Sequence, residues 1–148
     1  HQCEEHGIPG GFQQFVNTHV FNEPLVAEPF NPKRIFWINA TVIWLLFPLF
    51  AILAQHINPA FGLFLPIFGI VNATTHVLVG LVKRLYNPGL GVSLLLNYPL
   101  GFYTLIIANK YGYLARGWLV GMTLFCFTIH GLMIGCARYW YVQYKLES

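Results

Sequence analysis

Four long apolar stretches constrain this chain more than any other feature of its sequence. A helix needs roughly 20 apolar residues to cross the hydrocarbon core of a bilayer, and each of four stretches meets that length: 35–56, 60–82, 90–109 and 118–139. Prolines inside them are tolerated because neighbouring groups re-satisfy the freed backbone. We therefore predict an all-α, polytopic transmembrane helix bundle with four full spans. The short connections predict that consecutive helices are antiparallel neighbours.

The composition agrees with a surface that faces lipid. Charged residues make up 9% of the chain, against roughly 25% in an ordinary soluble domain. The net charge is only +3 and the eight Lys and Arg are scattered, so we expect no nucleic-acid partner and predict contact with membrane lipid. The three cysteines form no disulfide framework, and we expect all three to be reduced.

A polar segment, residues 1–34, precedes the spans and completes a single membrane domain that covers residues 1–148. Its first residues read as the end of a helix that Gly7 and Pro9 terminate. The remainder reads as an irregular loop on the membrane surface, although its four phenylalanines are expected to be buried. The chain does not begin with Met, and we expect a further segment before His1. Residues 35–148 form the four transmembrane helices.

The basic residues predict the orientation. In the four-span arrangement six of them fall on one side of the membrane: Lys33, Arg34, Lys83, Arg84, Arg138 and Lys145. Only Lys110 and Arg116 fall on the other side. Because cytoplasmic loops carry the excess of Lys and Arg, we predict that the first side and the C-terminus are cytoplasmic.

The first candidate site is the motif His1-Gln2-Cys3-Glu4-Glu5. Positions i, i+3 and i+4 share a helix face, so we expect His1, Glu4 and Glu5 to point together. An imidazole beside two carboxylates can hold a divalent cation, and the two glutamates can act as catalytic acid and base. A solvated helix end with no such role is the competing interpretation.

Two further polar groups lie inside the spans. Asn72 and His76 are four residues apart on one face of the second span, where they form either an interhelical hydrogen bond or part of a site. His130 lies in the middle of the fourth span, where a single histidine is often a packing residue. Intramembrane ionisable groups are costly and often functional.

Depth connects these groups. His76 lies seven residues before Lys83 and His130 eight before Arg138, which places them about 10 and 12 Å from the same membrane face. If His1–Glu5 is the last turn of a preceding membrane helix, it reaches the same level. We therefore predict a metal site formed by residues from three helices: His1, Glu4, Glu5, Asn72, His76 and His130.

These motifs together resemble the HXXEE family of small bacterial membrane proteins. The resemblance rests on HQCEE at 1–5, PGGF at 9–12, NATTH at 72–76, YNPGL at 86–90, Pro99 and His130. It implies a multi-pass protein of the bacterial inner membrane whose first helix carries the HxxEE motif. It carries no established activity, so it groups the motifs and supplies no substrate.

The residues favour a metal-dependent membrane enzyme. Histidine and glutamate suit Zn, Mn or Fe, and an open coordination position activates water for hydrolysis of a peptide or lipid-like substrate. The constellation is similar to that of the intramembrane CAAX-type proteases, an analogy of residue types alone.

Three alternatives stay open. An iron centre would make the protein a membrane oxidoreductase. An accessory subunit of a larger membrane complex would use the aromatic N-terminal loop for docking. A proton relay or transporter would need a homo-oligomer, because so few helices leave little room for alternating access.

Overall fold

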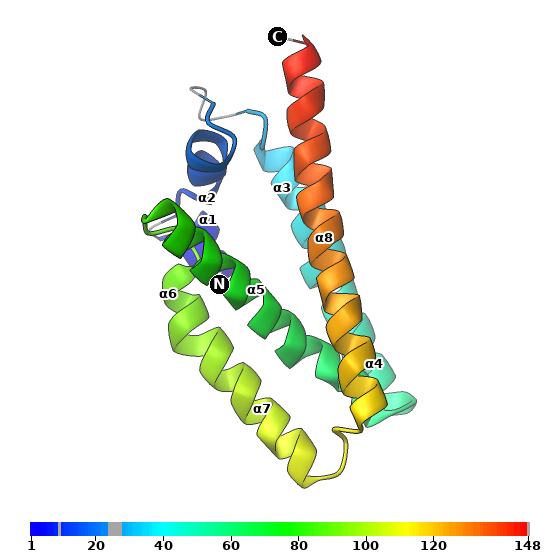
Figure 1. Cartoon of the computed structure of the whole chain (residues 1–148). Coiled ribbons are helices and arrows are strands. Elements are labelled where there is room, and N and C mark those ends of the chain that lie inside the picture. Colours follow the sequence, from blue (N-terminus) through cyan, green and yellow to red (C-terminus); the bar gives the residue numbers. More distant parts are fainter. Residues whose placement is uncertain (9, 24–27, 148) are drawn as a thin grey trace.

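Four membrane-length helical spans form a bundle that a short N-terminal segment covers at one end (Figure 1). The computed structural model describes residues 1–8, 10–23 and 28–147, and this part of the chain contains helices and no strand. The spans are Pro32–His56, Pro59–Lys83, Leu90–Lys110 and Arg116–Glu147. The predicted all-α, multi-pass fold class is therefore confirmed, and the last helix extends eight residues beyond the predicted end at position 139.

Three of the spans are divided into shorter elements, two of them close to a proline. The spans comprise α3 (Pro32–Asn39), η2 (Ala40–Leu46) and α4 (Phe47–His56); η3 (Pro59–Leu63) and α5 (Phe64–Lys83); α6 (Leu90–Val92), η4 (Ser93–Asn97) and α7 (Tyr98–Lys110); and α8 (Arg116–Glu147). The π-helical segments η2 and η4 end just before Pro48 and Pro99, where the missing N–H and the ring disrupt the regular hydrogen-bond ladder. Pro66 lies in the first turn of α5, where no N–H partner is needed.

Helix α5 is the central element. It packs against α4, α7 and α8, and 33% of its most apolar part is buried, against 11–17% for the other spans. A hydrophobic core joins it to its neighbours in the lower half of the bundle. There Phe64 is completely buried and its ring stacks on Phe50 at 4.2 Å between centroids.

The packing departs from a simple series of antiparallel neighbours. A short turn links α7 to α8, but the two helices then diverge (Figure 1). Helix α8 packs instead against α5, which runs in the same direction. Toward its C-terminal end α5 separates from α8, and the N-terminal segment lies over the opening.

The N-terminal segment is partly helical, which corrects the prediction of an irregular loop. It forms α1 (Gln2–His6), α2 (Phe12–Phe15) and η1 (Val16–Val20). Helix α1 ends before Gly7, as predicted, and Pro9 lies outside the described residues.

Side chains of the N-terminal segment attach it to the bundle and to itself. The buried Asn17 binds the backbone of Phe30 twice: its Nδ2 donates to the carbonyl oxygen at 3.2 Å, and its Oδ1 accepts from the N–H at 2.9 Å. Glu23 pairs with Lys145 of α8 at 2.7 Å. Of the four phenylalanines expected to be buried, Phe15, Phe21 and Phe30 are, and Phe12 is half-buried.

Candidate functional site

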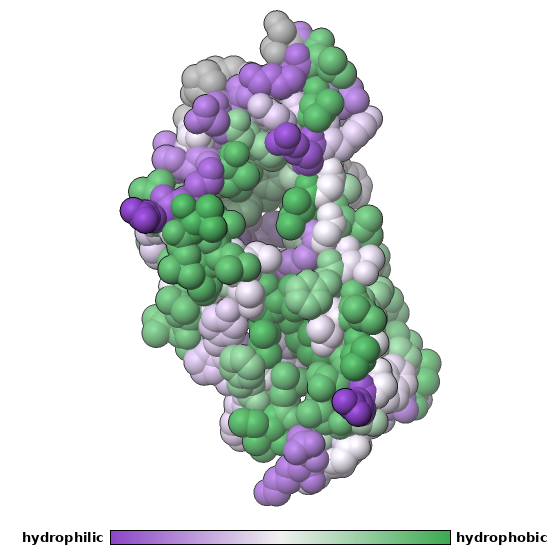
Figure 2. All heavy atoms as spheres, viewed as in Figure 1, coloured by the Kyte–Doolittle hydropathy of each residue, from purple (hydrophilic) through white to green (hydrophobic). Residues whose placement is uncertain are grey.

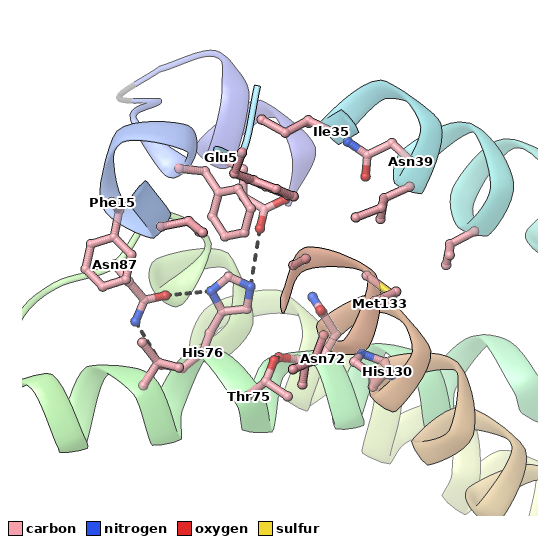
Figure 3. A pocket seen from close by; sticks show the side chains of 18 of the residues that line it. Glu5, Phe15, Ile35, Asn39, Asn72, Thr75, His76, Asn87, His130 and Met133 are labelled. Atoms are coloured by element: carbon pink, nitrogen blue, oxygen red, sulfur yellow. Dashed lines mark hydrogen bonds and ion pairs between the residues drawn. The ribbon is translucent and has the colours of Figure 1, made fainter. Parts of the chain in front are cut away.

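Three side chains converge where the N-terminal segment meets the centre of α5. Oε1 of Glu5 lies 3.2 Å from Nε2 of His1 and 3.3 Å from Nε2 of His76. One potential ligand atom from each residue lies within 4.8 Å of the other two. Glu5 and His76 are buried, and His1 is nearly so. Two residues of the N-terminal segment thus form one cluster with a residue of α5 that lies 71 or more positions further along the chain. Figure 3 shows Glu5 pointing down at the His76 ring.

Asn87 determines the tautomer of His76. The Asn87 Nδ2 donates to the backbone carbonyl oxygen of His76 at 2.8 Å, so its Oδ1 is the atom that faces Nδ1 of the same histidine, at 2.6 Å. An amide oxygen only accepts, and Nδ1 must therefore carry the proton. In neutral His76 the Nε2 lone pair then points at Glu5. Metal-binding histidines characteristically have this outer hydrogen bond, which orients the ring.

His1 differs, because its hydrogen bond is on the same nitrogen that faces Glu5, and its Nδ1 has no hydrogen-bond partner among the described residues. The Asn72 Nδ2 lies 2.9 Å from Nε2 of His1 and can donate to its lone pair. Nε2 of His1 has one lone pair, so a metal ion bound there would replace the Asn72 hydrogen bond. Nε2 of His1 and Nε2 of His76 lie 3.2 and 3.3 Å from a single carboxylate oxygen of Glu5. Such a convergence of electron-rich atoms requires a positive charge among them, which either a proton or a metal ion supplies.

Two of the three separations in the cluster fit a metal ion, and the third, between His1 and His76, is at most 4.8 Å. Two ligand atoms that each lie about 2.0–2.1 Å from a tetrahedral metal are about 3.3–3.4 Å from each other. The two distances from Glu5 to the imidazoles, 3.2 and 3.3 Å, match that separation closely. His1, Glu5 and His76 could thus hold a divalent ion and leave a coordination position open.

Glu4 is turned away from this cluster, which corrects the expectation that His1, Glu4 and Glu5 point together. Successive residues of a helix are about 100° apart around its axis, so Glu4 and Glu5 lie on opposite edges of the shared face. Tyr86 donates its hydroxyl hydrogen to Oε1 of Glu4. The backbone N–H groups of Gly91 and Val92, at the start of α6, donate to its two oxygens at 3.0 and 2.7 Å. Glu4 therefore anchors α1 to α6.

These contacts change the acidity of both partners. Burial by itself raises the pKa of Glu4, but the hydrogen bonds from Tyr86 and from the N–H groups of Val92, Gly91 and Gly89 outweigh it and leave the pKa below its ordinary value. The hydrogen bond to Glu4, together with burial and the carboxylate charge, raises the pKa of Tyr86. Glu4 is thus stabilised as a carboxylate and is poorly suited to accept a proton in catalysis.

His130 lies in the same cavity as His76 but outside the three-residue cluster. Its Nδ1 is 2.9 Å from the carbonyl oxygen of Cys126, so Nδ1 carries the proton and Nε2 has the lone pair. That Nε2 is buried and has no hydrogen-bond partner among the described residues. Phe68 packs against the ring at 4.5 Å between centroids. His130 is therefore placed to accept a hydrogen bond or a proton.

Several residues of the site were not predicted as such. Asn87 and Tyr86 appeared only as part of the YNPGL motif, and neither residue type alone indicated a role beside His76 or Glu4. Gly89, in the same motif, has φ = +100°, and a Cβ there would lie 2.6 Å from the His76 ring and 2.7 Å from the His1 ring. A glycine at this position allows the loop to press against both imidazoles.

His6 and Asn39 make a second contact with the cluster. Nε2 of His6 lies 3.7 Å from Oε2 of Glu5 and 3.3 Å from Nδ2 of Asn39. The Gln2 Nε2 donates to the same Glu5 oxygen at 3.2 Å. Glu5 is thus held by groups from the N-terminal segment and α5, and Asn39 of α3 reaches it only through His6, which together limit its freedom to turn out of the site.

A cavity of about 440 Å³ joins these groups. Its walls come from the N-terminal segment, α3, η2, α5 and α8, and Figure 3 shows Asn72, Thr75, His76 and His130 around its polar part. Most of the other lining residues are apolar. A mainly apolar cavity with a few converging polar groups is typical of a small-molecule site.

The fold and the cavity define a class, a multi-pass membrane helix bundle that holds a His/Glu cluster beside an apolar cavity. The chain belongs to the HXXEE family, described as a protein of unknown function with HXXEE motif, whose model matches residues 1–104. The match includes His1, Glu5, His76 and Asn87, and His130 lies beyond its end. No curated protein matches the chain, and no solved structure matches it.

Proposed function

We propose that this protein is a metal-dependent membrane enzyme that hydrolyses an apolar or lipid-like substrate, with His1, Glu5 and His76 as the metal ligands. The observation that carries the proposal is the convergence of their three ligand atoms within 4.8 Å, next to a mainly apolar cavity. Two histidines and one glutamate are a known ligand set of hydrolytic zinc sites. A metal bound there would polarise a carbonyl group and lower the pKa of a water molecule.

The other polar residues have supporting roles in this proposal. Asn87 orients His76 through its hydrogen bond to Nδ1, and the Asn72 contact to Nε2 of His1 would give way to the metal. Hydrolysis also needs a group that takes a proton from water. Both glutamates were candidates, but Glu5 is a ligand here and Glu4 is bound to Tyr86 and α6. The unpartnered Nε2 of His130 is the better-placed acceptor.

A second candidate is an iron-dependent membrane oxidoreductase. Two histidines and one carboxylate are also the ligand set of mononuclear non-haem iron enzymes, and the same cavity would bind the apolar substrate. The bound metal separates the two candidates. Zinc in the purified protein supports the hydrolase, and iron supports the oxidoreductase.

Elemental analysis of the purified chain tests the metal site. We expect about one transition-metal ion per chain, lost in His76→Ala and retained in His130→Ala. His56→Ala is the matched control, because His56 is exposed and lies at the other end of the bundle. No metal above background, or equal metal content in His76→Ala and His56→Ala, would overturn the proposal.

We also infer that the C-terminus is cytoplasmic and that the membrane is the bacterial inner membrane. The support is the uneven charge: the start of α3 and the ends of α5 and α8, which carry six basic residues, lie toward the same end of the bundle (Figure 1). A C-terminal fluorescent fusion that folds only in the cytoplasm should be fluorescent. A dark fusion that accumulates to normal amounts would reverse the orientation.

A further inference from the structure

Arg138 lies at one end of the cavity, and its position indicates what the cavity binds. We infer that the ligand is an anionic single-chain amphiphile, a molecule with one long apolar chain and a carboxylate or phosphate group that Arg138 binds. This inference rests on the proposed function, because it names the substrate class for the same site. It is carried by the pattern of side chains along α8, the charges in the cavity and the opening toward the membrane.

Helix α8 presents three pocket residues in a row. His130, Ile134 and Arg138 all line the cavity, and their spacing of four residues places them on one face of the helix. The row is about 12 Å long, since each residue adds about 1.5 Å. It has a buried hydrogen-bond acceptor at one end, an apolar side chain in the middle and a cation at the other end.

The middle of this row is open to the surroundings. Ile134 lines the cavity, yet 64% of it is exposed, so the cavity reaches the surface beside it. Figure 2 shows a hollow between the α5 and α8 sides of the bundle, with mainly hydrophobic residues around it. Because Ile134 lies within a membrane-length span, a ligand can enter this opening from the bilayer.

The interior suits an apolar chain. Phenylalanines 12, 15, 21 and 30 contribute walls from the N-terminal segment, and Phe68 and Met133 contribute walls from α5 and α8. Several of these side chains are buried in the chain itself. An apolar chain would replace empty space with van der Waals contacts on all sides.

The charges specify the other end of the ligand. Among the described residues that line the cavity, Arg138 is the one Lys or Arg and Glu5 is the one carboxylate. Glu5 faces His1 and His76, whereas Arg138 makes no ion pair within the described part of the chain and lies over the Tyr141 ring at 5.2 Å. Nearby basic residues differ, because Arg34 pairs with Glu28 and Lys145 with Glu23. A free guanidinium fits a carboxylate or phosphate group with two parallel hydrogen bonds.

Equilibrium binding of radiolabelled dodecanoate to the full chain in phosphatidylcholine nanodiscs tests this inference, with protein-free nanodiscs subtracted. Dodecyl phosphate and dodecanol serve as competitors that share the chain and differ in the head group. We expect saturable binding, displacement by dodecyl phosphate, and displacement by dodecanol that is at least tenfold weaker. Whichever anion binds more tightly identifies the head group. Equal displacement by dodecanol and dodecyl phosphate would overturn the anionic assignment.

Two variants, each with a matched control on α8, locate the binding site. Arg138→Gln should weaken dodecanoate binding by about tenfold or more, since charge-assisted hydrogen bonds contribute about 1.5–3 kcal/mol. Arg116→Gln, at the other end of the same helix, should leave it unchanged. Ile134→Trp should block the opening, whereas Leu132→Trp, also exposed but outside the cavity lining, should not. If either variant behaves like its control, the inference is wrong.

The metal content of the same samples separates this inference from the proposed function. His76→Ala should lose metal and still bind dodecanoate with an intact preference for the anion. A chain that holds metal but shows no preference for anionic chains would overturn the substrate class alone. A chain that binds dodecanoate at Arg138 but never holds metal would overturn the enzymatic proposal alone.

Discussion

The two halves of the bundle differ in how α5 is used. In the lower half, α5 packs into a closed core of aromatic rings, where Phe64 is fully buried and contacts Phe47, Phe50 and Phe68. In the upper half, the same helix separates from α8 and turns Asn72 and His76 toward a cavity. One continuous helix thus connects a closed hydrophobic core with a cavity that contains the His/Glu cluster.

The difference shows how a small membrane protein keeps polar groups in place. Hydrogen bonds hold these groups: Asn87 accepts from His76, Asn72 contacts His1, and Gln2 donates to Glu5. The closed core sets where α5 and α8 diverge, and thereby sets the width of the cavity. Substitutions in the core should therefore lower the free energy of unfolding, and substitutions around the cavity should lower the affinity for metal.

The largest expected effect is on the core. Phe64→Ala removes a fully buried ring, and we expect the free energy of unfolding to fall by about 3–5 kcal/mol, because the lost contacts leave a void. Reversible unfolding in mixed micelles measures this change. Leu124→Ala on the exposed face of α8 is the control, with an expected change of at most about 0.5 kcal/mol. Similar losses in both variants would contradict a closed core around Phe64.

The next effect concerns Gly89, whose backbone packs against the rings of His1 and His76. Gly89→Ala places a Cβ about where the two imidazole rings lie, so both ligands must move, and we expect metal affinity to fall by more than the roughly 10–100-fold typical of outer-shell changes. Gly112→Ala is a close control: it also has positive φ, +76°, but a Cβ there meets nothing within 4 Å. Titration with a competing chelator measures both. Equal affinities in the two variants would mean that the loop does not constrain the site.

The smallest of the three effects concerns the tautomer of His76. Asn87→Leu removes the acceptor for Nδ1–H and leaves the ring free to rotate, so we expect metal affinity to fall roughly 10–100-fold. Asn109→Leu on the exposed part of α7 should have no effect. The same chelator titration applies. An unchanged affinity in Asn87→Leu would show that Asn87 does not orient a metal ligand.

The three Asn-Pro pairs have the same sequence, but their asparagine side chains have different partners. Asn31-Pro32 and Asn58-Pro59 each open a span, and in both the asparagine side chain caps the helix by accepting from a backbone N–H, that of Arg34 or Ala60. Asn87-Pro88 has the same pattern, yet its side chain turns to His76. The dipeptide lies at or just before a helix start in all three places, and only the approach of α5 gives the third asparagine a different partner.

The sequence by itself determined the class of fold. Span length and the scarcity of charges require helices in a membrane, because backbone polar groups have no partner in lipid except within a helix or a closed barrel. Helix rise alone predicted similar depths for His76 and His130, and both residues line the same cavity. The tertiary structure decided which of two adjacent glutamates faces the cavity. Glu4 and Glu5 are chemically identical and about 100° apart on one helix, and the hydrogen bonds from Tyr86 and α6 assign Glu4 to anchoring and leave Glu5 with the histidines.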